Sequence, residues 1–160
     1  MNPLAWLIGL ALPACGFAAA DGLPTPPAMD VAHIVRPATP NTALAAPAGF
    51  TPPPDVVTRS YKVTPAALFA AVEAVAAGQD RTYQAALYPA DLQAHYVARS
   101  AVFNFPDLIA AQVNEAGADQ SMLVLYSRSV YGYSDLGVNR RRLDDWLVAL
   151  RARFNHPDER

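Results

Sequence analysis

Side chains that could do chemistry gather in one stretch of the sequence, residues 127 to 142. This stretch holds three serines, four arginines, one aspartate and one asparagine, with two glycines among them. A serine beside a general base can act as a nucleophile, and arginines near a helix N-terminus can bind an anion. Residues 120 to 129 alternate in the manner of a strand, and the residues after 142 have helical spacing. The stretch is therefore predicted to join a strand to a helix.

Catalysis by a serine of this stretch, Ser127 or Ser134, would need a base held by a third group. The three histidines, His33, His95 and His156, fall in a proline-rich segment, a predicted strand and a polar tail, without the spacing of a triad or of metal ligands. We expect His95 to face solvent from its strand. A serine hydrolase remains an alternative, but the sequence favours a protein with no catalytic residues, no cofactor and no metal.

Anion binding is the second interpretation of the stretch. Asp135 is expected to cap the following helix and to accept hydrogen bonds from Arg128. A structural alternative remains open, in which the whole stretch is a latch that fixes the last strand to the last helix. The adjacent Asp144 and Asp145 are expected to pair with arginines on an exposed helix face rather than to form a carboxylate dyad. The candidate ligand-binding residues are Arg128, Ser134, Asp135, Asn139, Arg140 and Arg141.

The same stretch carries a resemblance to a known family. Its sequence Arg128-Ser129, then Gly132 to Gly137, then Asn139-Arg140 resembles the C-terminal signature of the domain of unknown function 1499 family. Residues 39 to 47 and the proline-capped helix after residue 61 resemble the family more loosely, so the similarity covers residues 30 to about 155. It implies a fold and a location, because members are often envelope proteins with an export signal. The chain departs from the signature by inserting residues 130 and 131 before Gly132.

The first 20 residues have the composition of an export signal. They carry no charge, and residues 4 to 12 form an apolar run that is too short for a membrane span. Two cleavage sites compete. One precedes Cys15, where a bacterial lipoprotein would be cut and acylated, and the other follows Ala20. Cys15 is the only cysteine, so an internal disulfide is excluded. The sequence predicts export to the envelope, either as a membrane-anchored lipoprotein or free in the periplasm.

Residues 21 to 55 are predicted to form a partly ordered arm, since nine prolines between residues 22 and 55 exclude a regular helix or a central strand. The domain proper is expected at residues 56 to 155, with residues 156 to 160 as a polar tail. Strands are predicted at 56 to 63, 81 to 87, 93 to 105, 108 to 115 and 120 to 129. A helix is predicted after Thr64-Pro65, and a second helix is predicted to start within residues 127 to 142 and to continue to Phe154. Short turns between the later strands favour antiparallel pairing.

The predicted fold is an α+β domain, a curved antiparallel sheet of about five strands with two helices packed on one face. The apolar faces of the two helices should pack on the same face of the sheet. The residues expected there are Leu68, Phe69, Val72, Leu143, Trp146 and Leu150. The net charge of −2 argues against a nucleic-acid partner. We therefore expect a non-catalytic envelope module that binds a small anionic or lipid-like ligand or a partner protein, with membrane attachment through a lipid anchor. A structural role, in which the arm pairs with another subunit, remains a further alternative.

Overall fold

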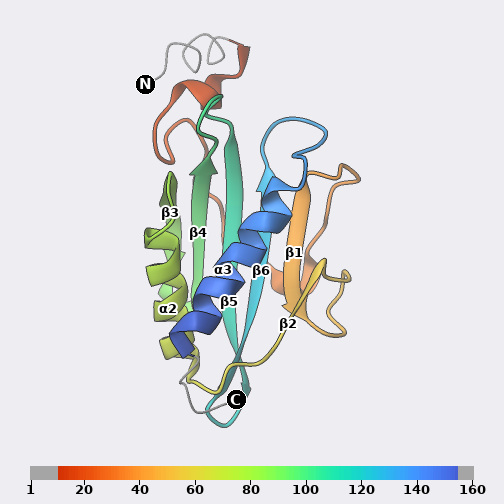
Figure 1. Ribbon diagram of the computed structural model, residues 1–160, viewed down its shortest axis with the longest axis vertical. Helices are drawn as coiled ribbons and strands as arrows, with labels where there is room; N and C mark the ends of the chain where they lie inside the picture. Colours follow the sequence, from red (N-terminus) through yellow and green to blue (C-terminus); the bar gives the residue numbers. More distant parts are fainter. Residues whose placement is uncertain (1–10, 155–160) are drawn as a thin grey trace.

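The computed structural model describes residues 11–154 and consists mainly of one sheet with two helices against it (Figure 1). No helix in this part of the chain is long and apolar enough to cross a membrane. The elements, in chain order, are η1 (Pro13–Gly16), η2 (Val31–His33), β1 (Thr42–Pro47), β2 (Val56–Thr58), α2 (Pro65–Ala77), β3 (Thr82–Tyr88), η3 (Pro89–Asp91), β4 (Gln93–Arg99), β5 (Pro106–Gly117), β6 (Gln120–Ser129) and α3 (Val138–Phe154).

The strands form a mixed sheet with the order β2-β1-β6-β5-β4-β3. β1 pairs with β2 in parallel, and every other neighbouring pair is antiparallel. The predicted α+β class, with a curved sheet and two helices on one face, is confirmed, but the sheet is mixed rather than antiparallel throughout. The strand count was too low, because residues 11–154 contain six strands rather than five.

Strand β1 is the element that the sequence did not predict. It lies inside the segment expected to be an arm, and it pairs with β6 along the registers Thr42 to Arg128 and Ala45 to Leu125. The sheet therefore begins well before residue 56. Two other strands are shorter than predicted. β2 ends at Thr58, and β4 ends at Arg99 because the chain turns there and Asn104 takes a left-handed conformation with φ of 58°.

Helix α2 forms as its local sequence predicts. The Thr64 side chain accepts a hydrogen bond from the backbone N–H of Ala67, Pro65 begins the helix, and Gly78 ends it. Its apolar face and that of α3 meet on the same side of the sheet. The core prediction is confirmed, since all six helix residues named for it are buried there: Leu68, Phe69, Val72, Leu143, Trp146 and Leu150.

The opposite side of the sheet is covered by the proline-rich arm. Met29, Val31 and Ile34 pack against a second apolar cluster that includes Leu44 and Val124. The arm is thus part of the folded domain, although it contains little regular structure.

Gln93 on β4 binds the arm directly. Its buried side chain accepts a hydrogen bond from the backbone N–H of Met29 at 2.5 Å and donates one to the Met29 carbonyl at 3.0 Å, in the manner of a β-bridge. His95 contacts the same amide oxygen at 2.8 Å and is only 7% exposed. The prediction that His95 faces solvent was wrong, and burial lowers the pKa of its imidazole. The residue is a neutral core histidine beneath the arm.

Candidate functional site

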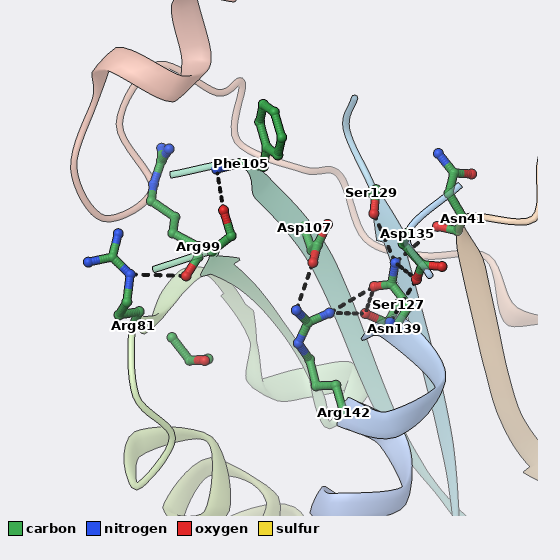
Figure 2. A network of polar contacts seen from close by, with 12 residues as sticks. Asn41, Arg81, Arg99, Phe105, Asp107, Ser127, Ser129, Asp135, Asn139 and Arg142 are labelled. Atoms are coloured by element: carbon green, nitrogen blue, oxygen red, sulfur yellow. Dashed lines mark hydrogen bonds and ion pairs between the residues drawn. The ribbon is translucent and has the colours of Figure 1, made fainter. Parts of the chain in front are cut away.

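Asn139, in the first turn of α3, is the centre of a buried polar network at the strand-to-helix junction (Figure 2). Its amide nitrogen donates to the Asn41 carbonyl and the Ser129 hydroxyl, each at 3.0 Å, and to the Asp135 carboxylate at 2.7 Å. Three chain segments are therefore held by one side chain: the start of β1, the end of β6 and the loop before α3. The fully buried amide has partners for its donors, as a stable interior requires.

The amide oxygen of Asn139 connects the network to an ion pair between Arg142 and Asp107. It accepts a hydrogen bond from the Ser127 hydroxyl at 2.5 Å and another from the Arg142 guanidinium at 2.8 Å. The same guanidinium donates to the Ser127 hydroxyl at 3.1 Å and pairs with the Asp107 carboxylate at 2.7 Å. Both side chains of this pair are largely buried, at 15% and 10% exposed. The network thus extends across the sheet from β1 to β5.

Asp135 caps α3, as the sequence predicts. Its carboxylate accepts hydrogen bonds from the backbone N–H of Gly137 at 2.9 Å and of Asn139 at 2.7 Å. Burial acts to raise the pKa of Asp135, but the hydrogen bonds from Asn139 and Gly137 outweigh it and bring the pKa below the ordinary value of 3.8. The helix N-terminus is consequently occupied by a carboxylate of the chain itself, and this disfavours an external anion at that point.

The predicted contact between Asp135 and Arg128 was wrong. Side chains alternate along β6, and Leu123 and Leu125 face the helices while Val124 and Tyr126 face the arm. Arg128 follows the second series, so it lies on the side of the sheet opposite to Asp135 and Asn139. The cation that enters the junction is Arg142 instead.

The remaining candidate residues lie on the surface and do not converge on one point. Arg140 pairs with Asp144 at 3.4 Å on the exposed side of α3, as predicted for that helix face. Arg141 donates to the Leu136 carbonyl at 3.1 Å. Ser134 is exposed and accepts a hydrogen bond from the backbone N–H of Leu136. Of the six candidates, the structure brings only Asp135 and Asn139 together.

Ser127, one of the two serines of the hydrolase alternative, does not have the surroundings of a nucleophile. The Ser127 hydroxyl is completely buried between an amide oxygen and the Arg142 guanidinium, and neither group can accept its proton as a base. Within residues 11–154 there is also no group of three or more metal-ligating side chains. The junction is built as a set of mutually satisfied hydrogen bonds.

The first prediction concerns the cap. Asp135→Asn should lower the free energy of unfolding by about 1 to 2 kcal/mol, because the amide keeps only one of the two acceptor oxygens and turns its NH2 group toward a backbone N–H. A larger loss would follow if the substitution stranded Arg128, but these two residues lie on opposite sides of the sheet. Thermal melts at pH 7 measure the change, with Arg140→Ala as the control at less than about 0.5 kcal/mol. An unchanged melting temperature in Asp135→Asn would contradict the cap.

The same cap has a defined pH dependence. Because the folded-state pKa of Asp135 is below 3.8, its contribution to stability is present above that pH and is lost as the pH falls through the folded-state value. The difference in melting temperature between the wild type and Asp135→Asn should therefore shrink as the pH is lowered below about 4. A difference that stays constant to pH 2 would show that the carboxylate charge does not matter.

A second polar cluster lies at the end of β4, on the other side of Figure 2. Arg99 is 4% exposed, and its guanidinium donates to backbone carbonyls of the segment at residues 14 to 21. The acceptors are Ala14 and Ala19, each at 2.6 Å, and Asp21 at 2.9 Å. A buried cation of this kind needs many oxygen partners to offset the loss of water. Backbone carbonyls provide them here.

Asn104 completes this cluster, which we call the carbonyl clamp: Arg99, Asn104 and Arg81. The Asn104 amide nitrogen donates to the carbonyls of Cys15 at 2.6 Å and Phe17 at 2.7 Å. Arg81 donates to the Asn104 amide oxygen at 2.6 Å and so fixes the orientation of that amide. The clamp holds a segment that the sequence had assigned, in part, to the export signal.

Cys15 lies within the clamped segment. Its side chain is fully buried, and burial raises the pKa of the thiol, against an opposing effect of Arg99. In the uncleaved chain the thiol is therefore not poised as a nucleophile. The clamp binds Cys15 through its backbone carbonyl.

The sequence missed four residues that organise these two clusters: Asp107, Arg142, Arg99 and Asn104. Alternation along β6 offered one usable signal, because it places Ser127 and Ser129 on the helix side and Arg128 on the other. The spacing of three between Asn139 and Arg142 offered a second, because it puts both on one helix face. The clamp had no such signal, since backbone carbonyls are the same at every residue.

Comparison with known proteins identifies the same family that the sequence of the junction resembles. A family model described as "Protein of unknown function (DUF1499)" matches residues 34–150. No curated protein and no solved structure matches the chain. The matched region begins in the arm just before β1 and ends within α3, so it includes the whole sheet and the junction network. The chain therefore belongs to the DUF1499 family.

Proposed function

We propose that this protein is a non-catalytic module of the cell envelope, exported and then held to a membrane through acylated Cys15. There it would bind a small anionic or amphipathic ligand or a partner protein. The main support for this proposal is the carbonyl clamp, which binds backbone carbonyls between residues 14 and 21. Because of these hydrogen bonds, most of this segment packs as part of the domain.

The two cleavage sites differ greatly in what they would remove from the clamp. Cleavage before Cys15 removes one carbonyl, that of Ala14. Cleavage after Ala20 also removes the carbonyls of Cys15, Phe17 and Ala19 and leaves only that of Asp21. Arg99 would then lose two of its three acceptors in this segment, and a buried cation without partners is costly. This comparison favours a mature chain that begins at Cys15.

The non-catalytic part of the proposal is supported by the junction network. Its serine, amide and guanidinium groups are engaged with one another, and the Asp107 carboxylate forms an ion pair with Arg142. Such a network stabilises a fold rather than a transition state. The arm is bound to its own sheet through Gln93, so we do not advance an assembly role through arm exchange.

The second prediction tests the anchor. Protein expressed with its signal in a Gram-negative bacterium should be recovered in the membrane fraction, and intact mass spectrometry should find a chain that begins at Cys15 and carries acyl groups. Cys15→Ser is the matched control, because it keeps the size of the side chain but has no sulfur to carry a diacylglyceryl group in a thioether linkage. A wild-type chain that begins at Asp21 without lipid would contradict the proposal.

The binding part is tested on the same preparation. Lipids and small metabolites extracted from the purified protein should contain a species enriched over an unrelated lipoprotein prepared in parallel. Turnover of a generic ester by the wild type, absent in Ser127→Ala or Ser134→Ala, would instead support the hydrolase alternative and contradict the non-catalytic proposal.

A further inference from the structure

Exposed apolar side chains gather in three segments at one end of the molecule. The end is defined by the C-termini of β4 and β6, the N-terminus of β5 and the N-terminus of α3, which antiparallel pairing places together. The clamped segment lies at the same end (Figure 1). We call the following set the apolar end: Phe17 at 47% exposed, Val102 at 52%, Phe103 at 43%, Tyr133 at 72% and Leu136 at 84%.

Hydrogen bonds tie the three segments to one another. Asn104, next to Phe103, holds the Phe17 carbonyl, so the turn after β4 adjoins the clamped segment. The loop before α3 joins them on its other side, since the Tyr131 hydroxyl accepts from the backbone N–H of Ala14 at 3.4 Å. The exposed apolar groups are therefore carried by one connected structure rather than by independent loops.

Leu136 is the most exposed apolar side chain of the apolar end. It takes a left-handed backbone conformation, with φ of 55°, which disfavours a residue of its kind. Its side chain is 84% exposed, so the free protein gains no burial in return. The neighbouring Asp135 turns its carboxylate inward to cap α3, while Arg141 lies against the Leu136 carbonyl. The surface here therefore presents the apolar Leu136 side chain next to the Arg141 guanidinium, while the Asp135 carboxylate points toward the helix.

We infer that the apolar end lies on the surface of a phospholipid bilayer, with Tyr133 and Leu136 inserted among the headgroups and Arg141 at the level of the phosphates. This inference rests on the proposed function, since the acylated Cys15 brings this end to the membrane. Tyrosine and arginine are suited to such an interface, because each combines an apolar body with a polar group that tolerates water or phosphate, and the leucine and phenylalanine side chains add apolar area.

The position of Cys15, the proposed attachment point of the lipid, favours a lipid bilayer over a soluble protein as the partner of the apolar end. The clamp holds the Cys15 carbonyl rigidly to the end of β4, so no flexible linker separates the attachment point from the apolar end. A short rigid tether raises the effective concentration of the membrane at this surface and leaves weak apolar contacts sufficient for docking.

Site-specific probes in the full acylated protein test the inference. Leu136→Cys and Tyr133→Cys introduce a thiol at the apolar end. Val148→Cys is the matched control, because Val148 is 58% exposed on α3 and lies about 2.8 helical turns from the start of that helix. Each is labelled with an environment-sensitive fluorophore and reconstituted into vesicles of phosphatidylethanolamine and phosphatidylglycerol. Unsubstituted protein measures labelling of Cys15.

We expect a blue-shifted emission at positions 133 and 136, with quenching by aqueous iodide reduced at least about threefold relative to position 148. Removing the vesicles with detergent and diluting the sample should abolish that difference. Probes at 133 and 136 that are quenched as fully as the probe at 148 in a membrane-held protein would overturn the docked orientation but leave the anchor intact. A mature protein without lipid, found free of the membrane, would overturn the anchor as well.

Discussion

Truncation of Trp146 to alanine should lower the free energy of unfolding by about 3 to 5 kcal/mol, as large aromatic truncations in a packed core do. Trp146 is fully buried between α3 and the sheet, and its ring packs edge-to-face against Tyr96 with the centroids 5.5 Å apart. The truncation leaves a cavity that neighbouring side chains fill only in part. Chemical denaturation followed by circular dichroism measures the change.

Trp146→Phe is the matched control for this experiment. The indole N–H of Trp146 has no acceptor among the described residues, so its removal sacrifices no hydrogen bond. The smaller ring should therefore cost only about 1 to 2 kcal/mol, well below the alanine substitution. If Trp146 fluorescence in a chain that begins at Cys15 were quenched by acrylamide like free indole, the core assignment would be wrong.

The elements that the sequence predicted best are those with local determinants. Helix α2 has its own cap in Thr64, its own first residue in Pro65 and its own stop in Gly78, so no distant contact is needed to define it. The apolar spacing of α3 likewise identified Trp146 as a core residue. Such signals come from residues within one or two turns of each other.

Strand β1 shows why other elements could not be predicted. Its sequence is rich in alanine, which has little strand preference, and prolines surround it. It becomes a strand because it fits between β2 and β6, and the strand that fixes its register is about 80 residues away in the chain. Pairing over that distance leaves no periodic signal in the sequence of β1 itself.

The candidate site was predicted only in part, because some of its contacts are also between residues far apart in the sequence. The capping role of Asp135 is local and was predicted correctly, whereas its partner was chosen by proximity in sequence, and Arg128 lies on the wrong side of the sheet. Arg142 finds Asp107 on β5, a contact that depends on how the strands are ordered. The latch interpretation of the junction gains support from this geometry, because the network joins β1, β5, β6 and α3.

The buried ion pair between Asp107 and Arg142 provides the sharpest test of the latch. Asp107→Ala should lower the free energy of unfolding by about 3 to 5 kcal/mol, because it leaves the Arg142 guanidinium in a largely buried position without its carboxylate. The neutral partners that remain, Ser127 and Asn139, satisfy only one of the guanidinium nitrogens. Thermal and denaturant unfolding at neutral pH measure the loss.

A double-substitution cycle separates the ion pair from the rest of the network. Arg142→Met removes the charge and keeps the length of the side chain, so Asp107→Leu with Arg142→Met replaces the pair by two apolar groups of similar size. The double variant should be more stable than the sum of the two single losses predicts, by roughly 1 to 3 kcal/mol. It should still fall short of the wild type, because Ser127 and Asn139 lose the hydrogen bonds from Arg142.

The cycle also distinguishes a latch from a ligand site. If the pair serves only the fold, the double variant, measured below its melting temperature, should keep the membrane association and any copurifying ligand of the wild type. A double variant that is as stable as the wild type but has lost its ligand would mean that Asp107 and Arg142 are retained for binding rather than for stability. Additive single losses with no coupling would mean that the 2.7 Å contact contributes nothing, and the latch would then rest on Asn139 and its partners alone.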